Sequence, residues 1–251
     1  MTMARAALAL TMLGVASCGG SGGTPDGGTP MNTTGSYYPL AVGDSWTLQQ
    51  TATDGTVSAE VVSVVAQEMV GGTGPSAAST AFRIVTGSKV NDPNGDIDWE
   101  GEVQTPDVWI VRYREENVGE TKGNEKNEAY WDPPRLRLDE AADRIVAGAS
   151  WEEDPYTEND TDVDTDPDGG TFIPDGGITS SVEHDIWSVV GVDEVVAVPA
   201  GTFKALHLKR INKDSANGVK EFWFVRGVGR VKETGNGKPT HELVSYHVVT
   251  P

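Results

Sequence analysis

The sequence predicts a mainly β protein built on an antiparallel sheet. A series of short segments after residue 44 is rich in Val, Ile, Thr and aromatic residues, and Gly, Pro, Asn or Asp separate them. Many of these segments alternate apolar and polar residues, which is typical of antiparallel strands with one face toward water. Only residues 138–148, LDEAADRIVAG, have a helical pattern. We therefore expect one antiparallel sheet, curved or shaped as a half-barrel, with at most one or two short helices.

The expected strands can be placed along the chain. They lie at 45–51, 57–66, 81–90, 108–115, 181–191, 194–201, 203–210, 220–226, 229–234 and 242–250. In residues 108–115, VWIVRYRE, strand alternation places Trp109, Val111 and Tyr113 on one face. Arg112 and Arg114 fall on the opposite face, which we expect to be wet.

A weak internal repeat suggests a further level of organisation. Residues 41–48, AVGDSWTL, and residues 145–153, IVAGASWEE, share a Gly-x-Ser-Trp core, and a segment with Ser-Val-Val follows each of them. The pattern indicates either two related β units or a coincidence among β-rich sequences.

The first 17 residues have the layout of a signal peptide. Arg5 precedes an apolar run at residues 6–16, and small residues follow. The run is shorter than the roughly 20 residues that a membrane-spanning helix needs. Val15-Ala16-Ser17-Cys18 resembles the bacterial lipobox, which implies that the signal is cut before Cys18 and that Cys18 is lipidated. An ordinary signal peptide with an unpaired cysteine is the alternative.

The lipobox resemblance also implies a destination. Gly19 stands where, in that family, an aspartate would favour retention in the inner membrane, so the resemblance implies the outer membrane. Residues 18–36 are rich in Gly, Ser, Thr and Pro and predict a flexible tether with a reach of about 25 Å. Residues 37–251 are expected to form a single β-rich domain.

The composition excludes several classes of protein. The 251-residue chain has 38 Asp and Glu against 19 Lys and Arg, which gives a formal net charge of −19. Such a surface repels phosphate backbones, and the sequence has no basic stripe for binding nucleic acid. Because Cys18 is the single cysteine, the monomer has no internal disulfide and depends on an apolar core.

Much of the negative charge lies in residues 152–178, a segment without Lys or Arg. This segment is also poor in apolar residues and rich in Gly and Pro, so we expect a solvated loop inserted into the domain. Its carboxylates up to residue 175 are Glu152, Glu153, Asp154, Glu158, Asp160, Asp162, Asp164, Asp166, Asp168 and Asp175.

The same segment contains a candidate calcium loop. Asp164, Asp166, Asp168 and Asp175 stand at positions 1, 3, 5 and 12, and Gly169 stands at position 6. Position 12 is Asp where a longer Glu is usual, and no flanking helices are expected. The alternatives are therefore a weak calcium site and a solvated acidic loop without an ion. No other cofactor is expected.

The sequence offers little for catalysis, and we expect no enzyme. Ser45 lies in a Gly-Asp-Ser-Trp block that is interpreted as a turn into the first strand, because no Asp-x-x-His follows near the C-terminus. The four histidines lack the spacing of a metal site and are interpreted as surface or satisfied residues.

Three blocks carry a family resemblance. Residues 37–48, YYPLAVGDSWTL, residues 196–210, VAVPAGTFKALHLKR, and residues 221–233, EFWFVRGVGRVKE, occur in this order. They resemble the Pro-Leu-x-x-Gly-x-x-Trp, Val-Pro-Ala-Gly-Thr-Phe and Gly-Val-Gly blocks of a diffuse group of bacterial lipoproteins of uncharacterised function. The resemblance covers most of the folded body. It implies no catalytic residues, because none are assigned in that group.

A looser similarity, to half-barrel periplasmic lipoprotein carriers, implies a ligand wall formed by Trp109, Tyr113, Phe222 and Phe224. The alternative is that these aromatic residues fill the core.

These features predict an exported lipoprotein of the outer membrane that faces the periplasm or the cell surface. We expect a non-catalytic module for binding or for interaction with the cell envelope. A carrier of a hydrophobic ligand and a calcium-binding surface protein are the alternatives. The expected partners are the membrane, through the lipid anchor on Cys18, and a protein or a hydrophobic ligand, and not nucleic acid.

Overall fold

The computed structural model of the chain describes residues 35–104, 108–118, 125–165, 171–172 and 177–249. The described part is all β and contains no helix, which confirms the predicted fold class. Accordingly, none of the described residues belongs to a helix able to cross a membrane.

The strands are β1 (Ser45–Thr51), β2 (Val57–Met69), β3 (Thr80–Gly87), β4 (Asp96–Gln104), β5 (Val108–Val118), β6 (Glu125–Asp139), β7 (Ser150–Glu152), β8 (Tyr156–Thr165), β9 (Thr171–Phe172), β10 (Ile178–Glu183), β11 (Asp185–Val198), β12 (Gly201–Asn212), β13 (Val219–Val225), β14 (Gly229–Gly235) and β15 (Thr240–His247). All pairings are antiparallel and form one open sheet with the order β10-β8-β6-β5-β4-β3-β2-β1-β15-β14-β13-β12-β11-β7, and β9 pairs with β8 beside this path.

Neighbours in the chain are mostly neighbours in the sheet, because short turns join antiparallel strands. The Val-Pro-Ala-Gly-Thr-Phe block illustrates this: Val198 pairs with Gly201 at the end of the β11–β12 hairpin. Gly201 has a φ of 136°, a backbone conformation that residues with a side chain rarely adopt. The predicted strand, turn and strand at this block are therefore confirmed.

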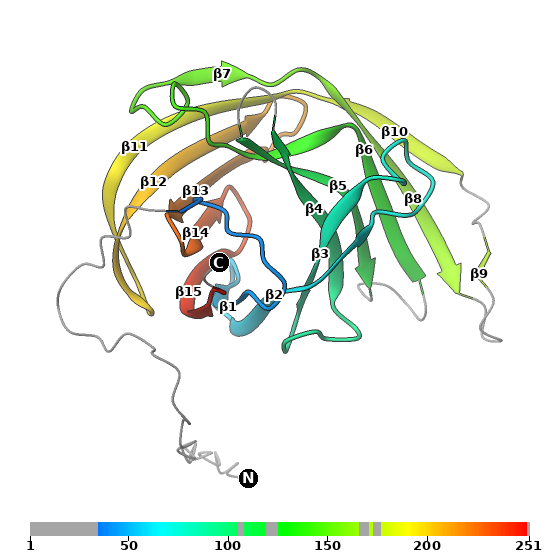
Figure 1. The fold of residues 1–251 in the computed structure, drawn as a ribbon, viewed down its shortest axis with the longest axis horizontal. Helices are drawn as coiled ribbons and strands as arrows, with labels where there is room; N and C mark the ends of the chain where they lie inside the picture. The colour runs from blue at the N-terminus through cyan, green and yellow to red at the C-terminus, as the bar shows by residue number, and fades with distance from the viewer. Residues whose placement is uncertain (1–34, 105–107, 119–124, 166–170, 173–176, 250–251) are drawn as a thin grey trace, which may run out of the picture.

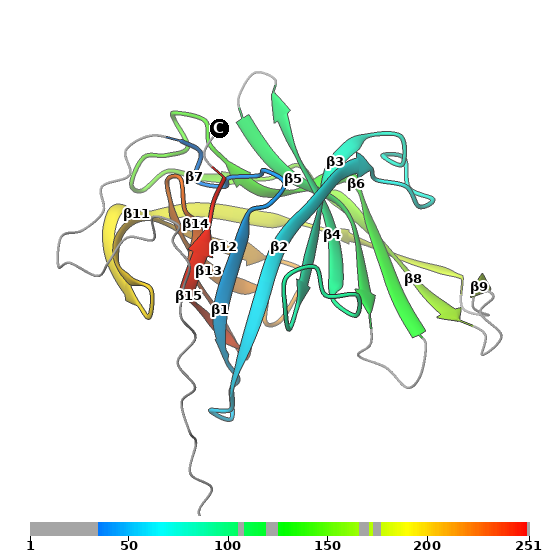
Figure 2. The ribbon, with the colours of Figure 1, turned by 60° about the horizontal axis from the view of Figure 1, so that its bottom comes forward.

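A long two-stranded ribbon connects the two ends of the strand order. In this ribbon β7 and β8 follow each other along one side and pair with β11 and β10 along the other side. Only His184 separates β10 from β11, and residues 153–155 separate β7 from β8. At one end of the ribbon β8 pairs with β6, and at the other end β11 pairs with β12. Figures 1 and 2 show β8 and β9 projecting from the rest of the molecule on this ribbon.

Two hydrophobic clusters form most of the core. The first gathers side chains from β1, β2, β3 and β11 to β15, among them Trp46, Leu48, Val64, Ile84, Phe203, Trp223, Val231 and Leu243. The second joins β5 and β6 to β11, β12 and β13 through Ile110, Leu136, Leu138, Trp187, Val189, Leu206, Leu208, Phe222 and Phe224. Strands that are distant in the sheet order thus pack face to face, and the segment before β1 lies inside the arch that they form (Figure 1).

The helix predicted at residues 138–148 is wrong. Leu138 is fully buried at the end of β6, where it pairs with Ile110 of β5. The chain then makes two turns, in which the amide of Ile145 donates to the carbonyl of Ala141 at 3.1 Å and the amide of Ala149 donates to the carbonyl of Val146 at 2.9 Å. The apolar residues whose spacing suggested a helix therefore belong to two different elements, the end of a strand and the turns that follow it.

The wet face predicted for residues 108–115 is also wrong. Arg114 is 8% exposed, and the Arg112 side chain is 13% exposed. The pairing of β5 with β6 shifts register between Ile110 and Val111 and again between Arg112 and Arg114. Because each irregularity disturbs strict alternation, the side chain pattern does not report the face of this strand.

The acidic segment is more ordered than its composition predicted. Residues 156–165 form β8, which pairs with β6 on one side and with β10 on the other. Tyr156 is 1% exposed and packs with Trp131 and Ala129. Pairing on both edges supplies the order that this sequence could not supply locally. A solvated loop is therefore wrong for the first half of the segment.

Candidate functional site

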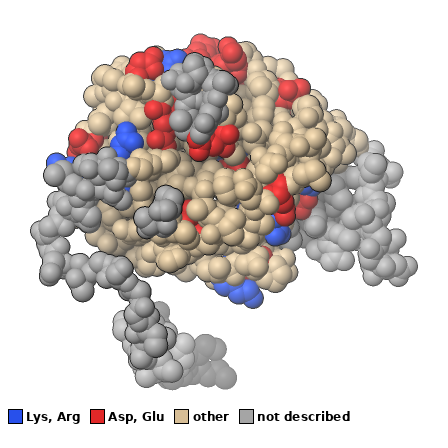
Figure 3. All heavy atoms as spheres, viewed as in Figure 1, with Lys and Arg blue, Asp and Glu red and all other residues tan. Residues whose placement is uncertain are grey.

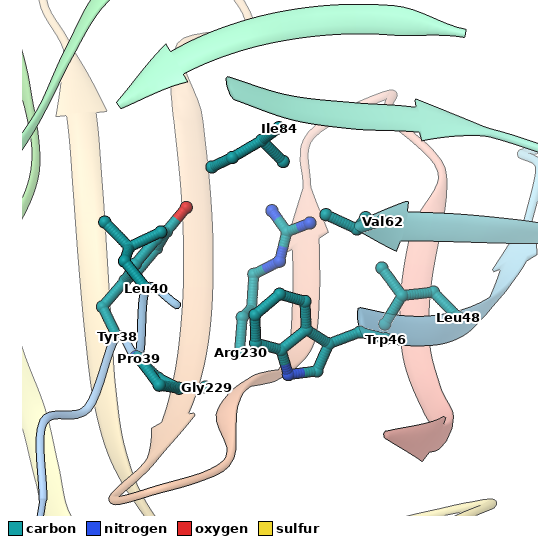
Figure 4. A pocket seen from close by; sticks show the side chains of 9 residues that line it. All are labelled: Tyr38, Pro39, Leu40, Trp46, Leu48, Val62, Ile84, Gly229 and Arg230. Carbon is teal, nitrogen blue, oxygen red and sulfur yellow. The ribbon is translucent and has the colours of Figure 1, made fainter. Parts of the chain in front are cut away.

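A small pocket opens beside the segment that leads into β1. Its lining comes from that segment and from β1, β2, β3 and β14, and consists of Tyr38, Pro39, Leu40, Trp46, Leu48, Val62, Ile84, Gly229 and Arg230. Figure 4 shows the guanidinium group of Arg230 beside the Trp46 ring, directed toward Ile84 and Val62. The cavity volume is about 50 Å³. At about 10–15 Å³ for each water molecule, the pocket has room for a few waters.

The segment before β1 is fixed in place by Glu140. One oxygen of this carboxylate accepts a hydrogen bond from the Ser36 hydroxyl and another from the Tyr37 amide at 2.9 Å. The Arg226 guanidinium lies over the Tyr37 ring at 4.1 Å and donates to the Gly35 carbonyl at 3.0 Å. Charge-assisted contacts of this kind are stronger than neutral hydrogen bonds. The point at which the chain enters the folded domain is therefore well determined.

Behind the pocket lies a buried ionic network centred on Glu100 of β4. The Glu100 side chain is 1% exposed, and its Oε2 accepts a hydrogen bond from the Tyr38 hydroxyl at 2.5 Å. Its Oε1 lies 3.2 Å from Nε of Arg112 and 2.9 Å from Nε of Arg137. Arg112 also donates to Asp98 at 2.9 Å. Strands β4, β5 and β6 thus bring two guanidinium groups and two carboxylates together inside the sheet.

These contacts shift the acidities of the network. Burial raises the pKa of Glu100, but the facing Arg137 and Arg112 outweigh burial and hold this pKa below its usual range. Burial raises the pKa of Asp98 to about 7, although Arg112 opposes the change. The hydroxyl pKa of Tyr38 is raised by burial and by the charge of Glu100. At neutral pH Glu100 is therefore ionised and Tyr38 is neutral, so the Tyr38 hydroxyl can donate to the carboxylate.

A second buried cluster surrounds Asp185, the first residue of β11. Its Oδ2 accepts a hydrogen bond from the Tyr156 hydroxyl at 3.0 Å and lies 3.7 Å from Nε of Arg210 and 3.8 Å from Nη2 of Arg135. Oδ1 of Asp185 and Nε of both arginines are buried without a hydrogen-bond partner. Burial and the charge of Arg135 lower the pKa of Arg210 to about 10. The loose spacing of these groups fits bridging water molecules.

A third group lies on β13 and β14. Glu233 accepts hydrogen bonds from Lys220 at 2.8 Å and from Arg230, which also lines the pocket. Burial raises the pKa of Glu233, but Arg230 and Lys220 outweigh burial and hold it well below its usual range. The cation at the edge of the pocket is therefore engaged by a carboxylate of its own strand.

The interior charges of the described residues thus pair largely with one another. A carboxylate or guanidinium held in several ion pairs is stabilised in its charged form, as Glu100 and Glu233 are, whereas burial raises the pKa of Asp98 to about 7. Burying such a network costs desolvation energy, which close pairing offsets. The arrangement can order the interior and hold a few waters or a very small ligand beside Arg230.

The four aromatic residues of the predicted ligand wall do not line this pocket. Phe222 and Phe224 are buried in the second hydrophobic cluster, with ring centroids 6.0 Å apart. Tyr113 packs at the edge of a separate small cluster around Trp99, and Trp109 is 39% exposed. Alternation placed Trp109 and Tyr113 on one face, but they occupy different environments.

Most of the other predicted site residues lie outside the described residues. These are Cys18 of the lipobox and Asp166, Asp168 and Asp175 of the candidate calcium loop. The backbone of Asp164 belongs to β8, where it pairs with Glu125 and Phe172. Within the described part of the chain, no group of three or more His, Cys, Asp or Glu side chains is placed to hold a metal ion. Calcium binding stays a prediction.

The Gly-Asp-Ser-Trp block forms a turn into β1, as its sequence indicated. Asp44 is fully buried, and its side chain accepts hydrogen bonds from the amides of Ala41 at 2.8 Å and Val249 at 2.7 Å. The carboxylate therefore ties the start of β1 to the C-terminal residues. Ser45 begins β1 and pairs with Ser63 of β2.

Two of the histidines show the satisfied environments expected from the sequence. The His207 ring stacks on Trp223 at 4.0 Å, and its nitrogens lie 2.8 Å from Glu194 and 3.2 Å from Glu221. His184 lies 2.8 Å from Asp214.

Sequence reasoning missed the buried network altogether. Its carboxylates come from β4, DIDWEGEVQ, a strand that was not predicted because Asp, Glu and Gly disfavour strands. A usable signal was present: carboxylates occupy every second position of residues 96–102, DIDWEGE, and arginines occupy positions 112 and 114 of the next segment. Opposite charges on neighbouring strands can form cross-strand pairs.

Comparisons of the chain with protein-family models, curated proteins and solved structures find no match.

Proposed function

We propose that this protein is a lipid-anchored lipoprotein of the outer membrane that acts as a non-catalytic interaction module and binds a partner protein on its outer surface. The observation that carries the proposal is the close packing of the interior in the described part of the chain. Two hydrophobic clusters and the ion-paired network occupy the space between the packed strands, and the pocket beside them measures about 50 Å³.

A carrier of hydrophobic ligands would need more room. Sites for drug-sized ligands measure about 300–1,000 Å³, and an acyl chain needs a comparable apolar space. The aromatic residues assigned to a ligand wall pack in separate places, and Phe222 and Phe224 belong to the core. An interaction on the outer surface agrees better with this packing.

The tether fits the same proposal. Glu140 and Arg226 fix the segment at residues 35–38, from which the chain leads back toward Cys18. A fixed exit point, combined with the tether that the sequence of residues 18–36 predicts, would hold the domain near a membrane and leave its outer faces accessible.

Site-specific photo-crosslinking in living cells tests this proposal. The full-length chain, produced in a Gram-negative bacterium in which it is lipidated, carries a photoreactive amino acid at one exposed position at a time: Ser58 of β2, Ser180 of β10, Val190 of β11 or Val244 of β15. A parallel Cys18→Ser chain serves as the control for membrane anchoring.

We expect the unsubstituted chain to sediment with the outer membrane and the Cys18→Ser chain to lose this association. We also expect a discrete protein adduct at a subset of the positions. Native mass spectrometry of the full chain extracted in detergent tests the alternative function, a carrier of hydrophobic ligands, by detecting a bound apolar molecule. An absence of adducts at all four positions would overturn the proposal, and a retained apolar molecule of several hundred daltons would then favour a carrier.

A further inference from the structure

Strand β10 ends the sheet and leaves one edge free. On its inner side all six residues, Ile178 to Glu183, pair with β8 in an unbroken register. On its outer side the neighbouring strand β12 ends at Asn212, which pairs with Asp185. Among the described residues, no strand pairs with the outer edge of β10. Unpaired backbone amides and carbonyls therefore line this edge.

The β10 edge has few of the features that protect most sheet edges: its one charged residue is Glu183 at its end, whose carboxylate accepts a hydrogen bond from Asn212 at 2.7 Å. Its sequence, ITSSVE, contains no Lys and no Pro, and the pairing with β8 has no bulge. The other terminal strand, β7, is only three residues long, and shortness is a usual form of protection. Ile178 and Val182 are 52% and 56% exposed. An added strand would find both backbone partners and apolar side chains at β10.

The two faces of the ribbon differ in chemistry. On one face Ile178 and Val182 lie beside threonines of β8, with which they pair. The other face carries Glu183 of β10 together with Glu158 and Asp160 of β8, which pair with Ser181 and Thr179. Because successive side chains of a strand point to opposite faces, a matching strand would alternate apolar residues with cationic ones.

Charge decides between the candidate occupants of this edge. A second copy of the chain would bring two β8 strands close together, each with Glu158 and Asp160. The sequence from Glu152 to Asp175 has ten carboxylates and no Lys or Arg. Like charges at this density repel, and the net charge of −19 adds to the repulsion. On the face shown in Figure 3, acidic side chains are likewise more prominent than basic ones. A cationic partner is favoured on the same ground.

We infer that the outer edge of β10 is a docking site at which an extended segment of another protein, with alternating apolar and Lys or Arg residues, adds as a further strand. The inference rests on the proposed function and specifies the partner class and the surface. Backbone hydrogen bonds supply affinity at such a site, and the alternate side chains supply specificity. Neighbouring strands are about 4.7–4.9 Å apart, so β8 would lie about 9–10 Å from the added strand, with β10 between them. Long Lys and Arg side chains that extend across β10 can approach the carboxylates of β8 over this distance.

The direct test measures binding of synthetic peptides to the full lipidated chain in a non-ionic detergent, by fluorescence anisotropy. The parent probe is an acetylated peptide of four Lys-Val repeats. Two matched probes carry N-methyl groups either on every Val or on every Lys, which removes the amide hydrogens from one edge of the strand and keeps all side chains. A peptide of four Glu-Val repeats reverses the charge.

The expected result is specific. Because alternate amides point to the same edge of a strand, one of the two methylated peptides should bind at least tenfold more weakly than the parent. The Glu-Val peptide should show no binding. Equal binding of both methylated peptides and the parent would overturn the inference, because attraction by charge alone does not depend on backbone amides.

A pair of protein variants locates the site. Val182→Lys places a cation on the free edge and should weaken binding of the parent peptide at least tenfold. Val190→Lys adds the same charge at a side chain that is 50% exposed on β11, and it should leave binding within twofold. Circular dichroism of both variants checks that the fold is kept. Equal effects of the two variants would contradict a site at β10.

The photo-crosslinking experiment separates this inference from the proposed function. If a protein adduct formed by the parent chain persists in the Val182→Lys chain, the proposed function stands and the β10 site is wrong. If no position yields an adduct in either chain, the proposed function itself fails. Loss of the adduct in the Val182→Lys chain alone supports both.

Discussion

Replacing Glu100 with Gln would remove the central anion of the buried network and keep its shape. The carboxylate accepts from the Tyr38 hydroxyl at 2.5 Å and lies within 3.2 Å of Nε of both Arg112 and Arg137. A glutamine amide offers two donor hydrogens on one of the two positions that now accept. An amide nitrogen at the Oε1 position would face both guanidinium groups, and at the Oε2 position it would face the Tyr38 hydroxyl. In either orientation both guanidinium groups would lose their shared counter-charge.

The expected loss of stability follows from this geometry. Removing one partner of a buried ion pair costs about 3–5 kcal/mol, because the remaining charge is left uncompensated. Glu100 is 1% exposed and faces two guanidinium groups, so we expect Glu100→Gln to fall in this range. For a chain of this size, such a loss corresponds to a fall in Tm of about 6–20 °C.

Urea unfolding followed by tryptophan fluorescence measures this loss, with the seven tryptophans as the probe. Glu102→Gln is the matched control, because it makes the same chemical change at an exposed position of the same strand and should stay within about 0.5 kcal/mol of the parent. A Glu100→Gln protein within about 1 kcal/mol of the parent would refute the view that this carboxylate compensates buried charge.

Two further substitutions test local features of the structure. Gly229 has a φ of 100°, and a Cβ there would lie 3.1 Å from Nε1 of Trp46, so Gly229→Ala should lower the Tm measured by calorimetry. Gly237 has a φ of 62°, and a Cβ there would have no atom within 4 Å, so Gly237→Ala introduces backbone strain without the contact and should lower the Tm by less. An equal fall in Tm in both variants would contradict a role for the contact with Trp46. Asp98 has a pKa of about 7 in the folded protein, above its usual 3.8. Between these two pH values the folded state therefore binds more protons than the unfolded state. As the pH rises from about 4 to 7, the Asp98 side chain consequently lowers the stability of the fold. The urea midpoint of Asp98→Asn should therefore improve relative to the parent between pH 5 and pH 8, and a difference that does not change with pH would contradict the raised pKa.

The apolar strands could be predicted from sequence because their signal is local. Residues 45–51 and 203–210 show the β-branched and aromatic composition of strands and lie in β1 and β12. Two of the strands that were missed, β4 and β6, contain many charged residues, and their order depends on partners far away in the chain. Residues 156–165 belong to the same class, because pairing with β6 and β10 on both edges orders a segment that is too polar to order itself.

The candidate sites could not be predicted from the sequence, because they depend on how the strands pair. A free sheet edge at β10 could not be foreseen, because it arises where β12 ends and the ribbon continues. The aromatic wall failed for a related reason: alternation identifies residues that share a face, but it does not tell which face of the sheet is inside. The buried pairing of Arg112 with Asp98 likewise depends on the register of two strands.

The sequence by itself determined the all-β class, the acidic charge and the positions of most apolar strands, because these depend on composition and on short-range alternation. The tertiary structure alone decided which face of β5 is buried, which charges pair inside the sheet and which strand edge remains free. Register shifts, such as the one between Trp99 and Glu100, change the face that a side chain occupies. Pairing across the sheet joins residues that are distant in the chain, and no local pattern specifies those distances.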